Sequence, residues 1–238
     1  MAEKRGYLEC EKQWVFRLLM LVAGFYGGYT LVVRGGVFSN AQTGNLALFA
    51  VAVGKGNWSD ALYYLIPMAG YVLGSVFAEI LPKFFRRSHL IRWDTALTLF
   101  EIIMVIIMGF IPSTAPHQIC QIIVNFICAL QYNTFRQAEG IAMATTFCTN
   151  HIRQLGTNVV RMWKPGQEGT EARRRAWAHT AMVLCFMAGV AAATVACRFL
   201  EVKAIWIALI PLLILFIDLL HADRTKEKDL LEVSPSGH

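Results

Sequence analysis

A segment rich in glycine and amide side chains lies between two apolar stretches that are long enough to enter a membrane. It reads Gly35-Gly36-Val37-Phe38-Ser39-Asn40-Ala41-Gln42-Thr43-Gly44-Asn45-Leu46. Adjacent glycines disfavour a continuous helix. Open backbone at membrane depth is tolerated only where protein buries it or a wet cavity solvates it. The segment therefore predicts an extended limb over residues 36–42, followed by a short half-helix that starts near Thr43.

The composition indicates a polytopic membrane protein that is embedded in the lipid bilayer. The 238 residues are 56% hydrophobic and 16% charged, with a mean hydropathy of +0.47, whereas a soluble domain carries about 25% charged residues. The first apolar run, Val15 to Val33, has no small-residue cleavage site before Arg34, so we expect a retained span. The formal charge of +6 comes from basic residues in short loops, where they set topology, so we expect no nucleic-acid partner.

Cysteines and histidines give no sign of a catalytic or metal centre. None of the six cysteines forms a CxxC pair, and all but Cys10 lie in or beside apolar segments. Reduced, buried thiols are the interpretation favoured over disulfides or metal ligands. The chain also has no nucleophile elbow, Walker motif or dinucleotide fingerprint. We therefore expect no catalytic residues, no metal and no cofactor, and a protein that is not an enzyme.

The apolar pattern predicts an all-α integral membrane protein built from two halves. A cytoplasmic tail, residues 1–14, precedes a first membrane repeat at 15–111; a second repeat follows at 117–220, and a charged, disordered cytoplasmic tail at 221–238. Six transmembrane helices are expected, with a broken element in each half at 35–55 and 140–160. The expected spans are 15–33, 61–81, 93–111, 117–135, 176–196 and 204–220.

The two halves show a positional repeat. Gly36-Val37-Phe38 before Thr43-Gly44-Asn45 is echoed by Gly140-Ile141-Ala142 before Thr149-Asn150-His151, at the same point in the order of spans. Lys and Arg gather in the N-terminal tail, at 83–92, at 161–175 and in the C-terminal tail. All four basic clusters fall on the cytoplasmic side if both broken elements are re-entrant, which gives a 3+3 inverted repeat with both termini inside. The alternative is that a limb plus half-helix crosses the bilayer.

Two motifs resemble one family. The stretch from Arg34 to Asn45 is similar to the first motif of the YoaK-like bacterial integral membrane proteins, a domain of unknown function. The second motif is Gln131-Tyr132-Asn133-Thr134-Phe135-Arg136, then Glu139-Gly140, then Ala144-Thr145-Thr146-Phe147-Cys148-Thr149. The sequence departs from the family at Asn150-His151, where a second Gly-Asn is usual, and at Gly27, where many relatives are acidic. The resemblance implies the membrane fold and a location in the bacterial plasma membrane.

The residues around the two predicted half-helix starts are the candidate substrate site. Thr43 and Thr149 are good N-cap types, and the amides and hydroxyls beside them either satisfy the opened backbone or cradle a substrate. Arginines near positive helix ends favour an anion; Arg34 either snorkels or acts in function. The predicted substrate-binding residues are Gln42, Thr43, Gly44, Asn45, Gln131, Asn133, Arg136, Thr146, Thr149, Asn150 and Arg153, and the predicted hinges are Gly35, Gly36 and Gly140.

Two further residues are candidates for proton coupling. Glu101 falls near the middle of an apolar span, where a carboxyl group either pairs with an arginine or stays protonated. His151 could titrate near neutrality. A polar stripe, Gln121, Asn125 and Cys128, recurs at helical spacing and should face the bundle interior. Gly70 and Gly74 form a small-residue face, for tight packing inside the bundle or for a homodimer seam.

These features predict a transporter of a small, anionic solute, with a midplane site between two half-helix N-termini and coupling to protons as an option. A passive channel for a neutral solute or an ion is the first alternative. A membrane scaffold or sensor that transports nothing is the second.

Overall fold

The computed structural model describes residues 6–88 and 90–235, without the side chains of 86–88, and is almost entirely helical. The main helices are α1 (Gln13–Val33), α2 (Gln42–Gly54), α3 (Trp58–Ser88), α4 (Trp93–Phe110), α5 (His117–Thr134), α6 (Thr149–Arg161), α7 (Gln167–Leu200) and α8 (Leu209–Arg224). Three short 3₁₀ helices, η1 (Glu9–Glu11), η2 (Glu201–Ala208) and η3 (Lys228–Leu230), and a hairpin of β1 (Gln137–Ala138) and β2 (Ile141–Ala142) complete the described fold.

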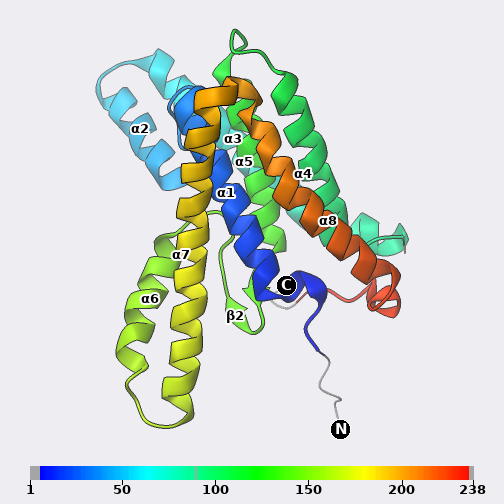
Figure 1. Ribbon diagram of the computed structural model, residues 1–238. Coiled ribbons are helices and arrows are strands. Elements are labelled where there is room, and N and C mark those ends of the chain that lie inside the picture. Colours follow the sequence, from blue (N-terminus) through cyan, green and yellow to red (C-terminus); the bar gives the residue numbers. More distant parts are fainter. Residues whose placement is uncertain (1–5, 89, 236–238) are drawn as a thin grey trace.

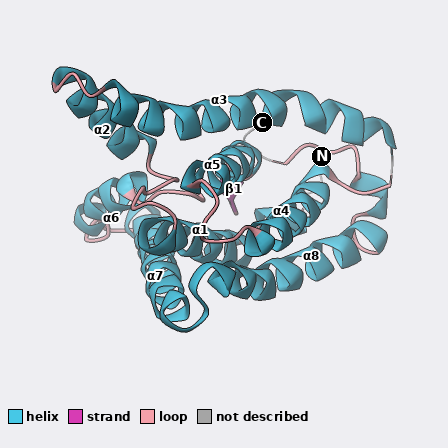
Figure 2. Ribbon diagram, turned by 90° about the horizontal axis from the view of Figure 1, so that it is seen from above, coloured by secondary structure: helices cyan, strands magenta, loops and turns pink. Residues whose placement is uncertain are grey.

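Helices α1 and α5 form the centre of the molecule. Helix α1 packs against α7, α8 and α5, and α5 packs against α3 and α4. Figure 2 shows α1 and α5 surrounded by the other helices, with α3 along one side and α2 beside it. Helix α2 packs on α3, and α6 packs on α7. Each short helix therefore lies on a long helix at the periphery rather than in the centre.

Four stretches of the described chain are long and apolar enough to cross a membrane, which makes the fold compatible with a multi-pass membrane protein. They are Gln13–Val33, Trp58–Phe85, Trp93–Phe110 and Gln167–Arg224. The last contains α7, η2 and α8, and Figure 1 shows α8 turning back downward after η2. Helix α5 is not among the four because its glutamines and asparagines lower its hydropathy.

The predicted helix ranges need two corrections. The basic loop expected at 161–175 is helical from Gln167 onward, and Glu171 pairs there with Arg174 and Arg175 one turn away. The C-terminal tail, expected to be disordered, continues α8 to Arg224 and forms η3, and Leu230 and Val233 pack against the core. Residues 1–5 and 236–238 of the two predicted tails lie outside the described residues.

Close helix contacts depend on small residues. A Cβ atom at Gly74 of α3 would lie 2.5 Å from the carbonyl oxygen of Phe126 on α5. One at Gly24 of α1 would lie 2.2 Å from the carbonyl oxygen of Phe186 on α7. Gly70 also faces α5, at Ile122. The small-residue face of α3 is therefore used for packing inside the molecule.

Apolar side chains outside the core cover the long helices. Leu62, Val72, Leu73 and Phe84 on α3 and Ile210 and Ile217 on α8 are among the residues that are more than half exposed. Such an apolar exterior, around an interior that holds buried asparagines and glutamines, is the pattern expected of a protein surrounded by lipid.

Candidate functional site

The polar side chains of α5 lie in the interior and form the centre of the candidate site. Gln121, Asn125 and Gln131 have no exposed surface, and Asn133 is half-buried. Gln121 Nε2 donates to the carbonyl oxygen of Arg34 at 2.7 Å and to the hydroxyl of Tyr63 at 2.9 Å. The stripe predicted from the spacing of Gln121 and Asn125 thus faces inward, and it binds both the end of α1 and the start of α3.

The chain turns inward directly after α1. Gly35 and Gly36 have φ angles of +86° and +71°, and a Cβ atom at Gly35 would lie 2.1 Å from the hydroxyl oxygen of Tyr63. Asn40 Nδ2 donates to the carbonyl oxygen of Ala23 at 2.8 Å. Ala23 lies ten residues before the last residue of α1, which is about 15 Å along a helix. Residues 35–41 therefore run back along α1 before α2 begins.

The start of α2 is attached to α5. Gln42 Nε2 donates to the backbone oxygen of Ser39 at 2.8 Å and to Asn125 Oδ1. Ser39 and Asn40 are buried as well. The N-cap of α2 is Ala41, and no side chain caps the helix, so the expectation that Thr43 caps it is wrong. Thr43 and Gly44 are exposed, whereas Asn45 is buried with Nδ2 3.4 Å from the carbonyl oxygen of Phe38.

The second broken element also reaches α5. Its hairpin turns at Glu139 and Gly140, with φ angles of +46° and +79°. Gln131 Nε2 then donates to the carbonyl oxygen of Thr145 at 3.0 Å. Thr145 and Thr146 are fully buried. Both broken elements are therefore hydrogen-bonded to the same helix.

Helix α6 begins at Thr149 with Cys148 as its N-cap and no side-chain cap. Thr149 is exposed and does not cap the helix, contrary to expectation. The predicted residue Asn150 accepts from Arg153 Nη2 at 2.9 Å, and Arg153 points to the exterior.

His151 forms a buried pair with His179 of α7. His151 Nε2 lies 2.7 Å from the carbonyl oxygen of Ala144, and the two Nδ1 atoms are 2.9 Å apart. A carbonyl can only accept, so His151 carries its proton on Nε2 and its Nδ1 accepts from His179. Burial lowers the pKa of His151, in agreement with a neutral ring. His179 stands alone in an apolar helix, so no local sequence signal identifies it as the partner.

Glu101 lies in the interior without an ion pair to any described residue. It is 1% exposed, and its neighbours are the hydroxyl of Tyr26 on α1 and the thiol of Cys128 on α5. Neither carboxylate oxygen has a hydrogen-bond partner within bonding distance among the described residues. Of the two arrangements considered for Glu101, pairing with an arginine is not observed in the described part of the chain.

Arg34 is fully buried, and its guanidinium group does not reach solvent. Nε donates to the hydroxyl of Tyr29 at 2.9 Å, and the terminal nitrogens donate to the carbonyl oxygens of Ile111 and Pro112 at 2.6 and 3.0 Å. These carbonyls lie at the C-terminal end of α4, where the partial negative charge of the helix dipole favours a cation. Arg34 thus joins α1 to the end of α4.

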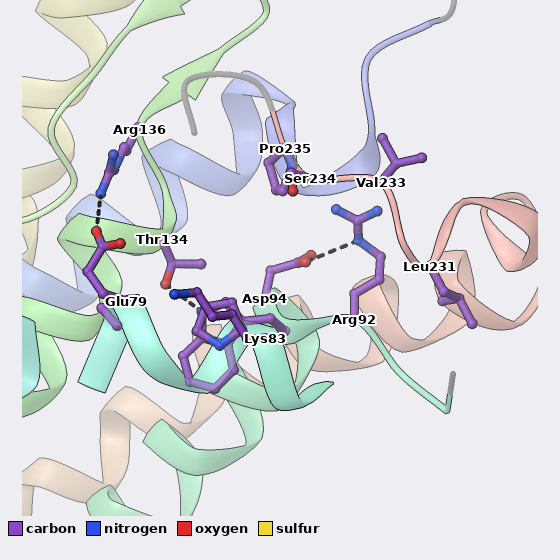
Figure 3. A pocket seen from close by; sticks show the side chains of 13 residues that line it. Glu79, Lys83, Arg92, Asp94, Thr134, Arg136, Leu231, Val233, Ser234 and Pro235 are labelled. Atoms are coloured by element: carbon purple, nitrogen blue, oxygen red, sulfur yellow. Dashed lines mark hydrogen bonds and ion pairs between the residues drawn. The ribbon is translucent and has the colours of Figure 1, made fainter. Parts of the chain in front are cut away.

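Two cavities open near the end of α5, and Arg136 lines both. One, of about 420 Å³, brings together three predicted site residues, Asn133, Arg136 and Asn150. The other, of about 370 Å³, lies between the end of α3, the start of α4 and the C-terminal tail. Figure 3 shows Arg136 bound to Glu79 on one side of this second cavity, and Arg92 bound to Asp94 on the other.

The structure separates the predicted site residues by burial, and Thr43, Gly44 and Thr149 are exposed. Gln42, Asn45, Gln131, Thr146 and His151 lie in the interior or at its edge. Arg136 is partly exposed and pairs with Glu79, and Arg153 is exposed on α6. Ser39, Asn40 and Thr145 belong with the interior group although they are absent from the predicted set. The first two stand inside the first glycine motif, which is the signal that could have identified them.

The comparisons with known proteins identify one family. The family described as "Protein of unknown function (DUF1275)" matches residues 15–217. No curated protein and no solved structure matches the chain. The matched range contains both glycine motifs and all eight main helices except the first two residues of α1 and the end of α8. The chain therefore belongs to the DUF1275 family, whose function is unknown, and its resemblance to the YoaK-like proteins is consistent with this membership.

Proposed function

We propose that the protein moves a small solute across a membrane, along the polar face of α5. One observation carries the proposal: the two broken elements approach from opposite ends of the bundle and each hydrogen-bonds to α5. Gln42 meets Asn125, and Thr145 meets Gln131. These positions on α5 are six residues apart, or about 9 Å along the helix axis.

The proposed topology has six crossings, α1, α3, α4, α5, α7 and α8, and two re-entrant elements. Residues 35–57 begin and finish at the same end of the bundle, the end at which α1 stops. Gly35, at the start of this segment, contacts Tyr63, which lies in α3 shortly after the segment. Within this segment, Asn40 reaches back along α1 as far as Ala23. In the second half, Glu139 contacts Gln13 and Arg174, at the end of the bundle where α1 begins. Open backbone at the inner ends of these elements is enclosed by protein, as a membrane requires.

The packing of the helices supports an inverted repeat. If α1 to α4 correspond to α5 to α8, the contact of α1 with α7 corresponds to that of α5 with α3. The contact of α2 with α3 corresponds to that of α6 with α7, and α1 with α8 corresponds to α5 with α4. Transporters built from such repeats bind their substrate at the interface between the halves, near the bilayer midplane.

The orientation follows from charge. Arg161 ends α6, Lys164 lies in the α6–α7 connection and Arg173 lies in the second turn of α7. Both described termini lie at the same end of the molecule in Figure 1. Basic residues are retained on the cytoplasmic side. We therefore place both termini in the cytoplasm, in the plasma membrane of a bacterial cell as the family resemblance implies.

A flux measurement tests the proposal. Purified protein in liposomes should accelerate the entry of at least one small solute over empty liposomes, in a panel of anions, cations and neutral molecules. Asn125→Leu should reduce this flux at least tenfold, because it removes the contact with Gln42 and lines the path with an alkyl group. Asn158→Leu is the matched control: Asn158 is also buried, but its amide binds only the carbonyl oxygen of Gln154 in its own helix.

The same measurement separates the alternatives. Saturating flux with a pH dependence that Glu101→Gln removes supports a proton-coupled carrier, and flux that never saturates supports a channel. Absence of flux for every solute, with folded protein, contradicts the proposal and leaves a scaffold or sensor.

A further inference from the structure

We infer that the transported solute is uncharged and donates hydrogen bonds, as a small polyol or an amide such as urea does. The inference rests on the proposed function and names its substrate class. It follows from which polar atoms of the buried lining are already bound within the protein and which are not.

The orientation of the buried amide groups is fixed by backbone carbonyls. Gln42, Gln121 and Gln131 each donate Nε2 to a carbonyl oxygen, that of Ser39, Arg34 and Thr145 respectively. Asn40 donates Nδ2 to the carbonyl oxygen of Ala23 in the same way. A carbonyl cannot donate, so none of these amides can be reversed without losing its bond.

The amide oxygens are the atoms that these bonds leave over in every case. The buried amide oxygens without a hydrogen-bond partner among the described residues are Asn40 Oδ1, Gln42 Oε1, Gln121 Oε1 and Gln131 Oε1. The nitrogens of Gln42 and Gln121 each have two acceptors and no proton to spare, whereas those of Asn40 and Gln131 each donate one recorded bond and keep one N–H. The buried hydroxyl groups of Ser39, Thr145 and Thr146 also have no protein partner. A buried acceptor left unpaired is costly, so the lining favours a solute that supplies N–H or O–H groups.

This lining disfavours an anion. An anion accepts hydrogen bonds and would face the negative ends of several fixed amide dipoles. The three nitrogens of Arg34 that could attract it are directed to Tyr29, Ile111 and Pro112. Arg136 and Arg153, which suggest an anion in the sequence, lie outside the buried lining.

A cation is disfavoured at both ends of the path. The charge of Arg34 is buried at one end, with only neutral partners among the described residues. Arg136, paired with Glu79, lines the cavity at the other end. Positive charges at a constriction exclude cations while neutral molecules pass. Glu101 is a buried carboxyl group on α4 that would favour a cation, and the experiment includes it for that reason.

The test is a stopped-flow light-scattering measurement on liposomes that contain the full-length protein. Inward gradients of urea or glycerol are compared with gradients of potassium nitrate and of guanidinium chloride, with ionophores that carry the counter-ions. Urea or glycerol should enter at least tenfold faster than into empty liposomes, and the salts at the rate of empty liposomes. Gln42→Met removes the unpaired Oε1, together with the two bonds donated by Nε2, at nearly constant volume, and it should reduce the neutral flux at least threefold. Gln154→Met, a half-buried glutamine of α6, is the matched control.

The outcomes are distinguishable. Flux of nitrate, or flux of guanidinium that Glu101→Gln abolishes, overturns the inference and leaves the proposed transport function standing. Entry of neutral solutes that is equal in wild type and Gln42→Met also overturns it, because the acceptor lining would then play no part. No flux of any solute through folded protein overturns the proposed function and the inference with it.

Discussion

Gly35 determines where the chain leaves α1 and enters the interior. Its φ angle is +86°, and the hydroxyl of Tyr63 occupies the place of a Cβ atom. Gly36 has a φ angle of +71° with no atom near its missing Cβ. A non-glycine residue in this conformation costs about 1–2 kcal/mol. Gly36→Ala should lose that amount of unfolding free energy, and Gly35→Ala more, because Tyr63 must also move away from Gln121.

Unfolding of the two variants in detergent, followed by circular dichroism, checks this. Gly44→Ala is the control, since Gly44 lies in α2 with open space around it and alanine favours a helix. Equal losses for Gly35→Ala and Gly36→Ala would contradict the assigned contact with Tyr63.

At the residue scale, the sequence predicts backbone features better than side-chain partners. The glycine pair and the amides after it predict a break and a new helix near Thr43, and α2 begins at Gln42. The N-cap residues differ from those expected. Ala41 and Cys148 precede the two helices, and Thr43 and Thr149 lie inside them. The partners of Asn40 and His151 lie on other helices, at Ala23 and His179. Such contacts depend on how the helices assemble, and no spacing within the chain encodes them.

The pairing of α3 with α5 holds the first half against the second. Gly74→Ala places a methyl group 2.5 Å from the carbonyl oxygen of Phe126 and should push the helices apart. Overpacking of this kind costs about 1–3 kcal/mol. Gly156→Ala is the matched control: Gly156 is also helical but has nothing within 4 Å of its missing Cβ, and alanine should be neutral or stabilising there. The thermal unfolding midpoints of the two variants test this prediction. Similar midpoints would refute the close contact between Gly74 and Phe126.

The terminal segments are tied to α4 by Arg92. Its Nε lies 3.0 Å from Asp94, with Asp223 and Glu227 within 4.0 Å, and all four residues are buried. Burial alone would lower the pKa of Arg92, but the Asp94 carboxylate and the other neighbours raise it. Arg92 also donates to the carbonyl oxygen of Leu230 in η3. These contacts, together with the packing of Leu230, order the tail that the charged sequence predicts to be disordered.

Arg92→Met should therefore be strongly destabilising, because it leaves buried carboxylates without their cation, a loss of about 3–5 kcal/mol. Lys164→Met is the control, since Lys164 and Glu168 form an exposed pair, which is worth at most about 1 kcal/mol. Denaturant unfolding, with proteolysis of the C-terminal tail as a second readout, compares the two. A loss no larger than that of Lys164→Met would refute the role assigned to Arg92.

At the element scale, helix ranges are predictable where the apolar pattern is strong. Helices α1 and α4 match the expected 15–33 and 93–111 closely. Helices α3 and α7 extend beyond the expected 61–81 and 176–196, because polar residues continue a helix outside the apolar run. Hydropathy alone marks only where a helix can enter lipid.

At the scale of the whole molecule, the proposed inverted repeat makes a prediction about sidedness. The loop that carries Ser113 and the loop that precedes Gln167 lie at opposite ends of the bundle in Figure 1. In cells that express a variant without native cysteines, Ser113→Cys should react with an impermeant maleimide added outside. Gln167→Cys should react only after permeabilisation. Reaction of both from the same side would contradict the proposed topology.

The central claim is that the polar interior beside α5 is a path between the two sides of the membrane. Ser39→Cys and Thr146→Cys, made singly in the cysteine-free background, test it most directly, because both native side chains are buried at the inner ends of the broken elements. A small, uncharged, polar thiol reagent that does not cross the bilayer should reach Ser39→Cys from outside and Thr146→Cys from inside, and a transported solute should slow both reactions. If neither cysteine reacts from either side while the protein is folded, the interior is a closed core and the transport account is wrong.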